Sequence, residues 1–137
     1  MTTRSLTTPL AWLARLWWRD LPLAVRGERW AAWWLRVRRY RLLHRNLRAH
    51  GAEADLIMLD PDGRTVVIVE VKTRRDDALW PEAALGPVKQ RSMERIADYL
   101  AGHGARQTAP MRFDAVVIVW PHGGVPAVRH YRDVWGG

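Results

Sequence analysis

The side chains best suited to chemistry are Glu70 and Lys72. They lie at the end of an apolar segment, residues 64–72, where they follow a run of valine and isoleucine. β-Branched residues are typical of a strand buried on both faces, and the two-residue period places Ile68, Glu70 and Lys72 on one face. Burying a carboxylate and an ammonium is unfavourable unless they are paired or used. The pattern therefore predicts either a mutual Glu70–Lys72 ion pair or a reactive site.

Lysine is rare in this chain, since Lys72 and Lys89 are the only lysines among 22 basic residues. Arginine carries a broad, permanently charged fork, whereas lysine carries a compact point charge with a tunable pKa. A chain that uses arginine almost everywhere else indicates, by keeping Lys72, that a small ammonium is needed beside Glu70.

Size and charge point to a single domain with a polyanionic partner. The 137 residues suffice for a sizeable core, and the net charge of +8 favours nucleic acid first and an anionic membrane surface second. Eight arginines lie between Arg26 and Arg48, with Glu28 as the single acid. The alternative interpretation of this stretch is a solvated basic face.

Several classes of site are disfavoured by composition. The chain has no cysteine, which excludes disulfides, thiolate metal sites and a cysteine nucleophile. The five histidines show no zinc-ligand spacing. No apolar run approaches the roughly 20 residues that span a bilayer, so we expect no integral membrane segment. We also expect no signal peptide and a cytoplasmic location.

The chain divides into an N-terminal helical extension, residues 1–24, and a domain, residues 25–137. Thr8 and Pro9 are suited to begin a helix in the extension that runs to about Arg19. Its tryptophans could pack against the domain, against a second copy, or on a membrane surface.

Within the domain, periodicity and turn residues predict a mixed α/β sheet flanked by helices. The last strand is expected at a sheet edge because Pro126 begins it. Val37 and Val88 are expected on the apolar sides of the two helices. The predicted order is helix 27–39, strands 40–47, 53–59 and 64–72, helix 86–100, and strands 111–120 and 126–131.

The second and third strands should form an antiparallel hairpin, because the intervening segment, residues 60–63, reads Asp-Pro-Asp-Gly. This hairpin carries Glu53 and Asp55 toward Glu70. A connection of two or four residues places Asp55 and Glu70 on one face, whereas three residues would place them on opposite faces unless a bulge intervenes.

If the faces match, Asp55 and Glu70 converge with Glu28 or Glu53, and Lys72 lies beside them. Carboxylates that close cannot all stay ionised without a cation. Their hard oxygens suit Mg²⁺ or Mn²⁺, which would polarise a phosphodiester. Lys72 could orient a water or stabilise transition-state charge.

These residues resemble the PD-(D/E)XK nuclease superfamily through Asp55 and the Glu70-Val-Lys72 motif. More closely, the chain from about Arg26 onward is similar to the YraN family of predicted endonucleases. The matching pieces are Arg26-Gly-Glu28, Arg45-Asn46, Glu53-Ala-Asp-Leu-Ile57, Val69-Glu-Val-Lys-Thr-Arg74, Lys89-Gln-Arg91 and Arg112-Phe-Asp114.

The resemblance implies a restriction-endonuclease-like core related to Holliday-junction resolvases. It implies that Asp55, Glu70 and Glu28 are the metal ligands and that Lys72 is the catalytic lysine.

The resemblance also gives Lys89 and Arg91 a substrate-side role at a helix start. Surrounding arginines, including Arg45 and Arg74, would follow the nucleic-acid backbone. Asp114 is expected to be a structural partner for an arginine such as Arg112 or Arg45.

Three functional hypotheses follow. The first is a Mg²⁺- or Mn²⁺-dependent endonuclease acting on DNA, which could be branched or otherwise structured. The second is a nucleic-acid-binding module that keeps the fold without catalysis. The third is a protein-interaction or membrane-surface adaptor built on the N-terminal extension. A homodimer would suit cleavage of two strands, since one site cuts one strand.

Overall fold

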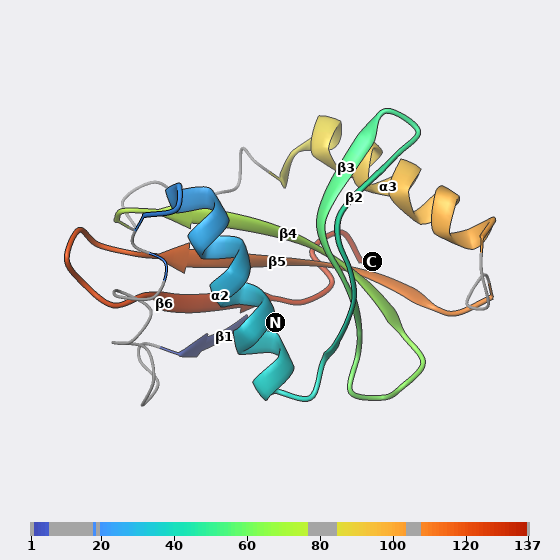
Figure 1. Ribbon diagram of the computed structural model, residues 1–137. Helices are drawn as coiled ribbons and strands as arrows, with labels where there is room; N and C mark the ends of the chain where they lie inside the picture. The colour runs from blue at the N-terminus through green and yellow to red at the C-terminus, as the bar shows by residue number, and fades with distance from the viewer. Residues whose placement is uncertain (1, 6–17, 19, 77–84, 104–107, 137) are drawn as a thin grey trace.

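The protein folds around one six-stranded sheet (Figure 1). The computed structural model describes residues 2–5, 18, 20–76, 85–103 and 108–136. Its sheet has the order β1-β6-β5-β4-β3-β2. The elements are β1 (Thr2–Ser5), α2 (Leu23–Val37), β2 (Arg41–Ala49), β3 (Ala52–Leu59), β4 (Val66–Arg74), α3 (Pro87–Ala101), β5 (Met111–Val119) and β6 (Ala127–Tyr131).

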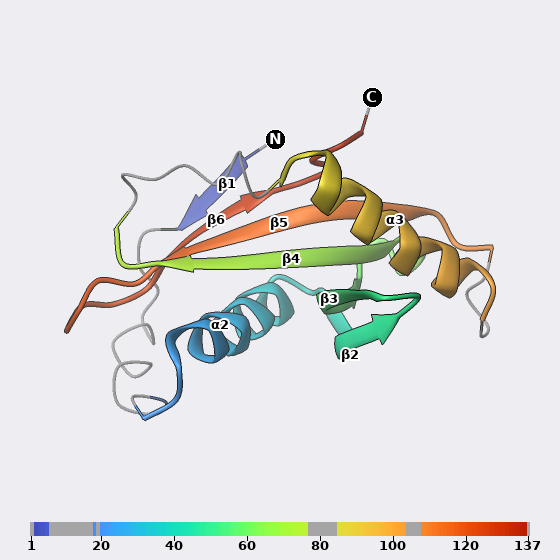
Figure 2. The same cartoon turned by 90° about the horizontal axis from the view of Figure 1, so that it is seen from above.

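The sheet is mixed, because β4 and β5 run parallel while the other neighbouring strands are antiparallel. A parallel pair needs a crossover, and the segment between β4 and β5 contains α3. Helices α2 and α3 lie on opposite sides of the sheet (Figure 2). This confirms the predicted α/β class and is compatible with a restriction-endonuclease-like core.

The alternation along β4 divides the core into two layers. Val67, Val69 and Val71 belong to the buried cluster that includes Trp30 and Trp34 of α2. Val66 and Ile68 belong to the cluster that includes Met93 and Ile96 of α3. Because both faces of β4 are covered, the strand is apolar along most of its length, as the sequence indicates.

Helix α2 approaches β4 so closely that only glycine fits at the contact. A Cβ added to Gly27 would overlap the hydroxyl of Thr73 and lie 2.8 Å from the Thr73 Cβ. Glu28 follows Gly27 directly, so this contact fixes the height of Glu28 above the sheet.

The β3–β4 connection has the even length that the site requires. Gly63 N donates to Asp60 O at 2.9 Å, and Gly63 has a φ of 74°. Asp60 N donates to Thr65 O, and the connection between these two hydrogen-bonded residues contains four residues. The register then pairs Leu56 with Val69, and its continuation by one residue puts Asp55 and Glu70 opposite each other. The interpretation that puts both carboxylates on one face is therefore confirmed.

A buried polar network centred on Arg112 and Asp114 links β5 to β6 and to the β3–β4 connection. Arg112 donates through Nε and Nη2 to Asp114, and through Nη1 to Asp60 at 2.7 Å. Asp114 also lies 2.7 Å from His130 Nε2, and Arg112 reaches the hydroxyl of Tyr40. Burial raises the pKa of Asp114, but hydrogen bonds with His130 and Arg112 hold it below its ordinary value. Asp114 is thus the structural partner of Arg112, as predicted.

Some details differ from the sequence analysis. β6 is not an edge strand, because β1 pairs with its outer side. Pro126 precedes the first residue of β6, so it removes no hydrogen bond from the strand. Val37 and Val88 are exposed, since both lie near helix ends.

The first strand, β1, was not anticipated. Apart from Trp18, which is in a turn, the predicted helix over residues 8–19 lies outside the described residues, as does most of the N-terminal extension. No helix in the described part of the chain is long and apolar enough to cross a membrane.

We predict that Gly27→Ala will lower the free energy of unfolding by about 1–3 kcal/mol, because the new methyl must push α2 away from Thr73. Urea unfolding followed by circular dichroism measures this loss. Gly102→Ala is the matched control, since a Cβ there meets only ordinary contacts at 3.6 Å or more. Equal stability of the two variants would contradict the close-packing argument.

Candidate active site

The site opens where β3 separates from β4. The paired residues of the two strands end at Leu56 and Val69. Beyond that point the Asp55 side chain replaces a backbone carbonyl as the acceptor. Its Oδ2 accepts a hydrogen bond of 2.8 Å from Val71 N. Figure 1 shows β3 turning away from β4 in this region. The divergence leaves room for side chains between the two strands.

Glu70 is held by both lysines of the chain. Its Oε1 lies 3.3 Å from Lys72 Nζ, and its Oε2 lies 2.7 Å from Lys89 Nζ. The Glu70 side chain is only 6% exposed. The predicted ion pair with Lys72 is confirmed, and Lys89 of α3 is a second partner that the sequence did not reveal. Spacing could not show it, because Lys89 is 19 positions further along the chain.

One oxygen of this buried carboxylate still lacks a hydrogen bond. The Lys89 ammonium is close enough to Glu70 Oε2 for an ion pair, yet no donor with hydrogen-bond geometry reaches that atom among the described residues. Glu70 therefore has its charge balanced by two ammonium groups, and Lys89 holds this oxygen through its charge.

Glu28 joins the site from α2. A cavity of about 180 Å³ is lined by Glu28, Arg45, Asn46 and Asp55, among others. Burial raises the pKa of Glu28, and the charges of Glu53 and Glu70 raise it further. Arg45 and a hydrogen bond with Asp55 act in the opposite direction. Glu28 and Asp55 therefore line one cavity, and the charge of Glu70 acts on both of them.

Asp55 carries the largest carboxylate perturbation in the described part of the chain. Burial, followed by repulsion from Glu70, raises its pKa to about 7, although the Val71 amide acts to lower it. A hydrogen bond between Asp55 and Glu28 requires a proton on one of them. Without a bound cation, the carboxylates therefore relieve their repulsion by retaining a proton.

Asn46 is a site residue whose structural role sequence reasoning missed. The register of β2 and β3 places it across from Asp55, and its φ of 50° is left-handed. Among residues other than glycine, asparagine adopts this conformation most readily. An asparagine inside an otherwise regular strand was the available signal for this kink.

The remaining candidate residues differ in their surroundings. Arg45 borders the Glu28–Asp55 cavity, whereas Arg91 is exposed on α3. Arg74 turns back toward the main chain, with its Nη1 donating to Thr73 O at 3.2 Å.

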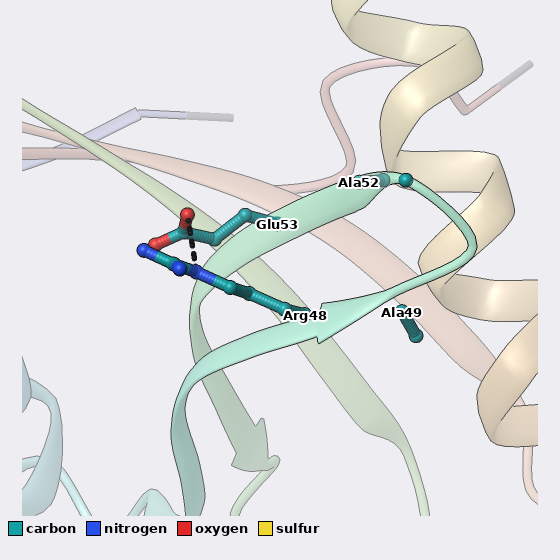
Figure 3. A pocket seen from close by; sticks show the side chains of 5 residues that line it. Arg48, Ala49, Ala52 and Glu53 are labelled. Atoms are coloured by element: carbon teal, nitrogen blue, oxygen red, sulfur yellow. Dashed lines mark hydrogen bonds and ion pairs between the residues drawn. The ribbon is translucent and has the colours of Figure 1, made fainter.

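Glu53 forms an exposed ion pair of 3.0 Å with Arg48, while its charge still acts on Glu28. Figure 3 shows this pair facing each other across the β2–β3 hairpin. A wide hollow beside the hairpin turn, lined by these residues and Gly51, contains no other charged group. We therefore place the chemistry at Asp55 and Glu70 instead of at this hollow.

As placed, no three His, Asp or Glu side chains in the described ranges form a group that could hold a metal. Glu70 faces two ammonium groups, and one Asp55 oxygen is occupied by the Val71 amide. Binding a cation at these residues would require side-chain rearrangement.

Comparison with known proteins identifies the family. The model of the family described as "Uncharacterised protein family UPF0102" matches residues 27–118. The chain belongs to the UPF0102 family. This is the YraN family, so the resemblance noted from the sequence is confirmed. The matched segment contains all three carboxylates and both lysines.

Individual UPF0102 proteins align over most of their length. The chain is 38% identical to a UPF0102 protein of Geotalea uraniireducens over 114 residues, which is 82% of this chain and 88% of that protein. It is 39% identical to one of Anaeromyxobacter dehalogenans over 113 residues, covering 81% of each. The family model itself matches from α2 into β5.

We predict that the free energy of unfolding will fall as the pH rises from about 4 to about 7, because folded Asp55 retains its proton up to pH 7 while the unfolded chain loses it near pH 4. Asp55→Asn should remove this part of the pH dependence. Urea unfolding without divalent metal, at several pH values, measures it. The exposed Asp98→Asn on α3 is the control and should follow the parent curve.

Proposed function

We propose that this UPF0102 protein is a metal-dependent endonuclease that hydrolyses phosphodiester bonds in DNA. The observation that carries the proposal is the convergence of Glu28, Asp55 and Glu70 from three different elements, with Lys72 beside them. Most of the chain is strongly basic, yet it gathers acids here. A surface that only attracts nucleic acid would gain nothing from buried carboxylates that repel it.

The chemistry of these residues fits a divalent cation. The raised pKa values of Asp55 and Glu28 reflect a local excess of negative charge. Oxygen ligands of this kind suit Mg²⁺ or Mn²⁺, which would polarise the phosphodiester for hydrolysis when bound. Asp55, Glu70 and Glu28 are the residues that would hold it.

In this proposal the two lysines have different roles. Lys72 lies on the same strand and face as Glu70, so its ammonium can orient a water or stabilise negative charge on the phosphate in the transition state. Lys89 approaches from the first turn of α3 and neutralises the buried Glu70.

The basic residues around the carboxylates supply the substrate contacts in this proposal. Arg45 stands at the edge of the Glu28–Asp55 cavity. Arg91 on α3 and Arg74 at the end of β4 are positioned on neighbouring elements. Guanidinium groups can contact backbone phosphates without reading sequence, so affinity should depend steeply on salt.

A second candidate is a nucleic-acid-binding module without catalysis. The observation that favours it is the double ion pair of Glu70, which satisfies the charge of that residue within the protein. This hypothesis predicts binding that survives loss of Glu70 and no cleavage in any metal.

We predict that Glu70→Gln will abolish cleavage of labelled DNA in Mg²⁺ or Mn²⁺, because it removes the charge that a cation needs, and that Lys72→Ala will slow cleavage by at least about 100-fold. Four-way junction, flap, linear and single-stranded substrates should be compared, with EDTA as the metal-free reference. Glu94→Gln, an exposed change on α3, should cleave like the parent. Cleavage by Glu70→Gln at the parental rate would refute the proposed active site.

Metal binding can be tested separately from activity. We predict that millimolar Mn²⁺ will raise the thermal unfolding midpoint of the parent, since a ligand of the folded state stabilises it. The rise should be absent in Asp55→Asn and in Glu70→Gln, and present in Glu94→Gln. An equal rise in all four proteins would show that the ion binds elsewhere.

A further inference from the structure

Two arginines outside the candidate site are anchored on one buried residue, Trp120. The Arg26 guanidinium carbon lies 4.4 Å from the centre of the Trp120 ring. Arg75 Nη1 donates to the carbonyl oxygen of the same residue at 3.3 Å. Trp120 is 1% exposed, so it provides a rigid base for both side chains. Both guanidinium groups are thereby pre-organised in one place.

This arrangement brings like charges together. Arg26 lies over the Trp120 ring and Arg75 lies at the carbonyl oxygen of the same residue, so both cations contact one residue. Arg26 Nε is buried and has no hydrogen-bond partner among the described residues. An anion between the groups would relieve the repulsion and use donors that the protein leaves unsatisfied.

The pair lies beside the carboxylates on the same elements. Gly27 fixes α2 on Thr73, and the residues on its two sides are Arg26 and Glu28. Arg26 contacts the Trp120 end of the sheet, while Glu28 lies by Asp55. On the other element, Arg75 follows Lys72 by three residues, which is about 10 Å along an extended chain.

We propose that Arg26 and Arg75, both held on Trp120, form a binding site for a backbone phosphate of a nucleic-acid strand. This site rests on the proposed function for its substrate, and it adds a fixed contact point on the elements that carry the proposed active site. Two guanidinium groups can donate several hydrogen bonds to phosphate oxygens, and such contacts position a strand without reading its bases. The expected substrate preference is therefore independent of sequence at this contact.

The test measures binding without cleavage. Affinity for a labelled short DNA duplex is determined in EDTA, by fluorescence anisotropy, over a range of salt concentrations. Arg75→Gln should weaken binding several-fold at low salt, and it should reduce the slope of log affinity against log salt by about 0.9, the value for one phosphate contact. Arg26→Gln should act in the same way, whereas Arg26→Lys should retain most of the slope because it keeps the charge.

Arg64→Gln is the matched control. Arg64 is exposed and precedes β4, at the opposite end of that strand from Arg75. Its removal should leave the slope unchanged. If Arg64→Gln and Arg75→Gln reduce the slope equally, the effect is one of overall charge and the proposed site is wrong. An unchanged slope in Arg75→Gln, or a parent that binds no DNA, also overturns it.

Separate controls distinguish a loss of binding from unfolding and from loss of catalysis. If Arg26→Gln unfolds because Trp120 loses its stacking partner, Arg75→Gln still carries the test, since Arg75 makes only a carbonyl contact with Trp120. Reduced binding in Arg75→Gln with no cleavage by the parent would support this site while rejecting the nuclease proposal. Cleavage by the parent with an unchanged binding slope would do the reverse.

Discussion

The geometry of the site depends on where the β3–β4 ladder stops. A backbone ladder continued by two more residues would bring the strands together and occupy the Val71 amide with a carbonyl oxygen. Here the Asp55 side chain accepts that hydrogen bond, so the strands can separate while the amide remains satisfied. The same bond keeps a buried carboxylate next to Glu70. Separation of the strands and accumulation of negative charge therefore have one cause.

The three elements around this opening are fixed by contacts of different kinds. α2 is held by the absence of a side chain at Gly27, and α3 by Met93 and Ile96 in the second core cluster. The far end of the β3–β4 hairpin is held by the buried Arg112 network through Asp60. Each contact lies outside the carboxylate group itself. A site with internal repulsion can persist because its frame gains stability elsewhere.

Much of this could be predicted from local sequence. The alternation in β4 and the Asp-Pro-Asp-Gly turn determine the register, and the register places Asp55 across from Glu70. Contacts between distant segments could not be predicted in this way. The Lys89–Glu70 pair depends on how α3 packs, and β1 depends on pairing with a strand 125 positions away. A four-residue strand has too little pattern to be recognised by its own composition.

The position of β1 has a consequence for how the chain acquires its structure. Thr2 pairs with Tyr131, so β1 must pair with a segment that is synthesised much later. Chains grow from the N-terminus at the ribosome, and a contact across this separation requires closure of a very long loop. The hairpins and the β4–β5 crossover can form beforehand. Until β1 docks, the outer edge of β6 remains open to any other strand, and the completed sheet acquires its border only after synthesis of β6.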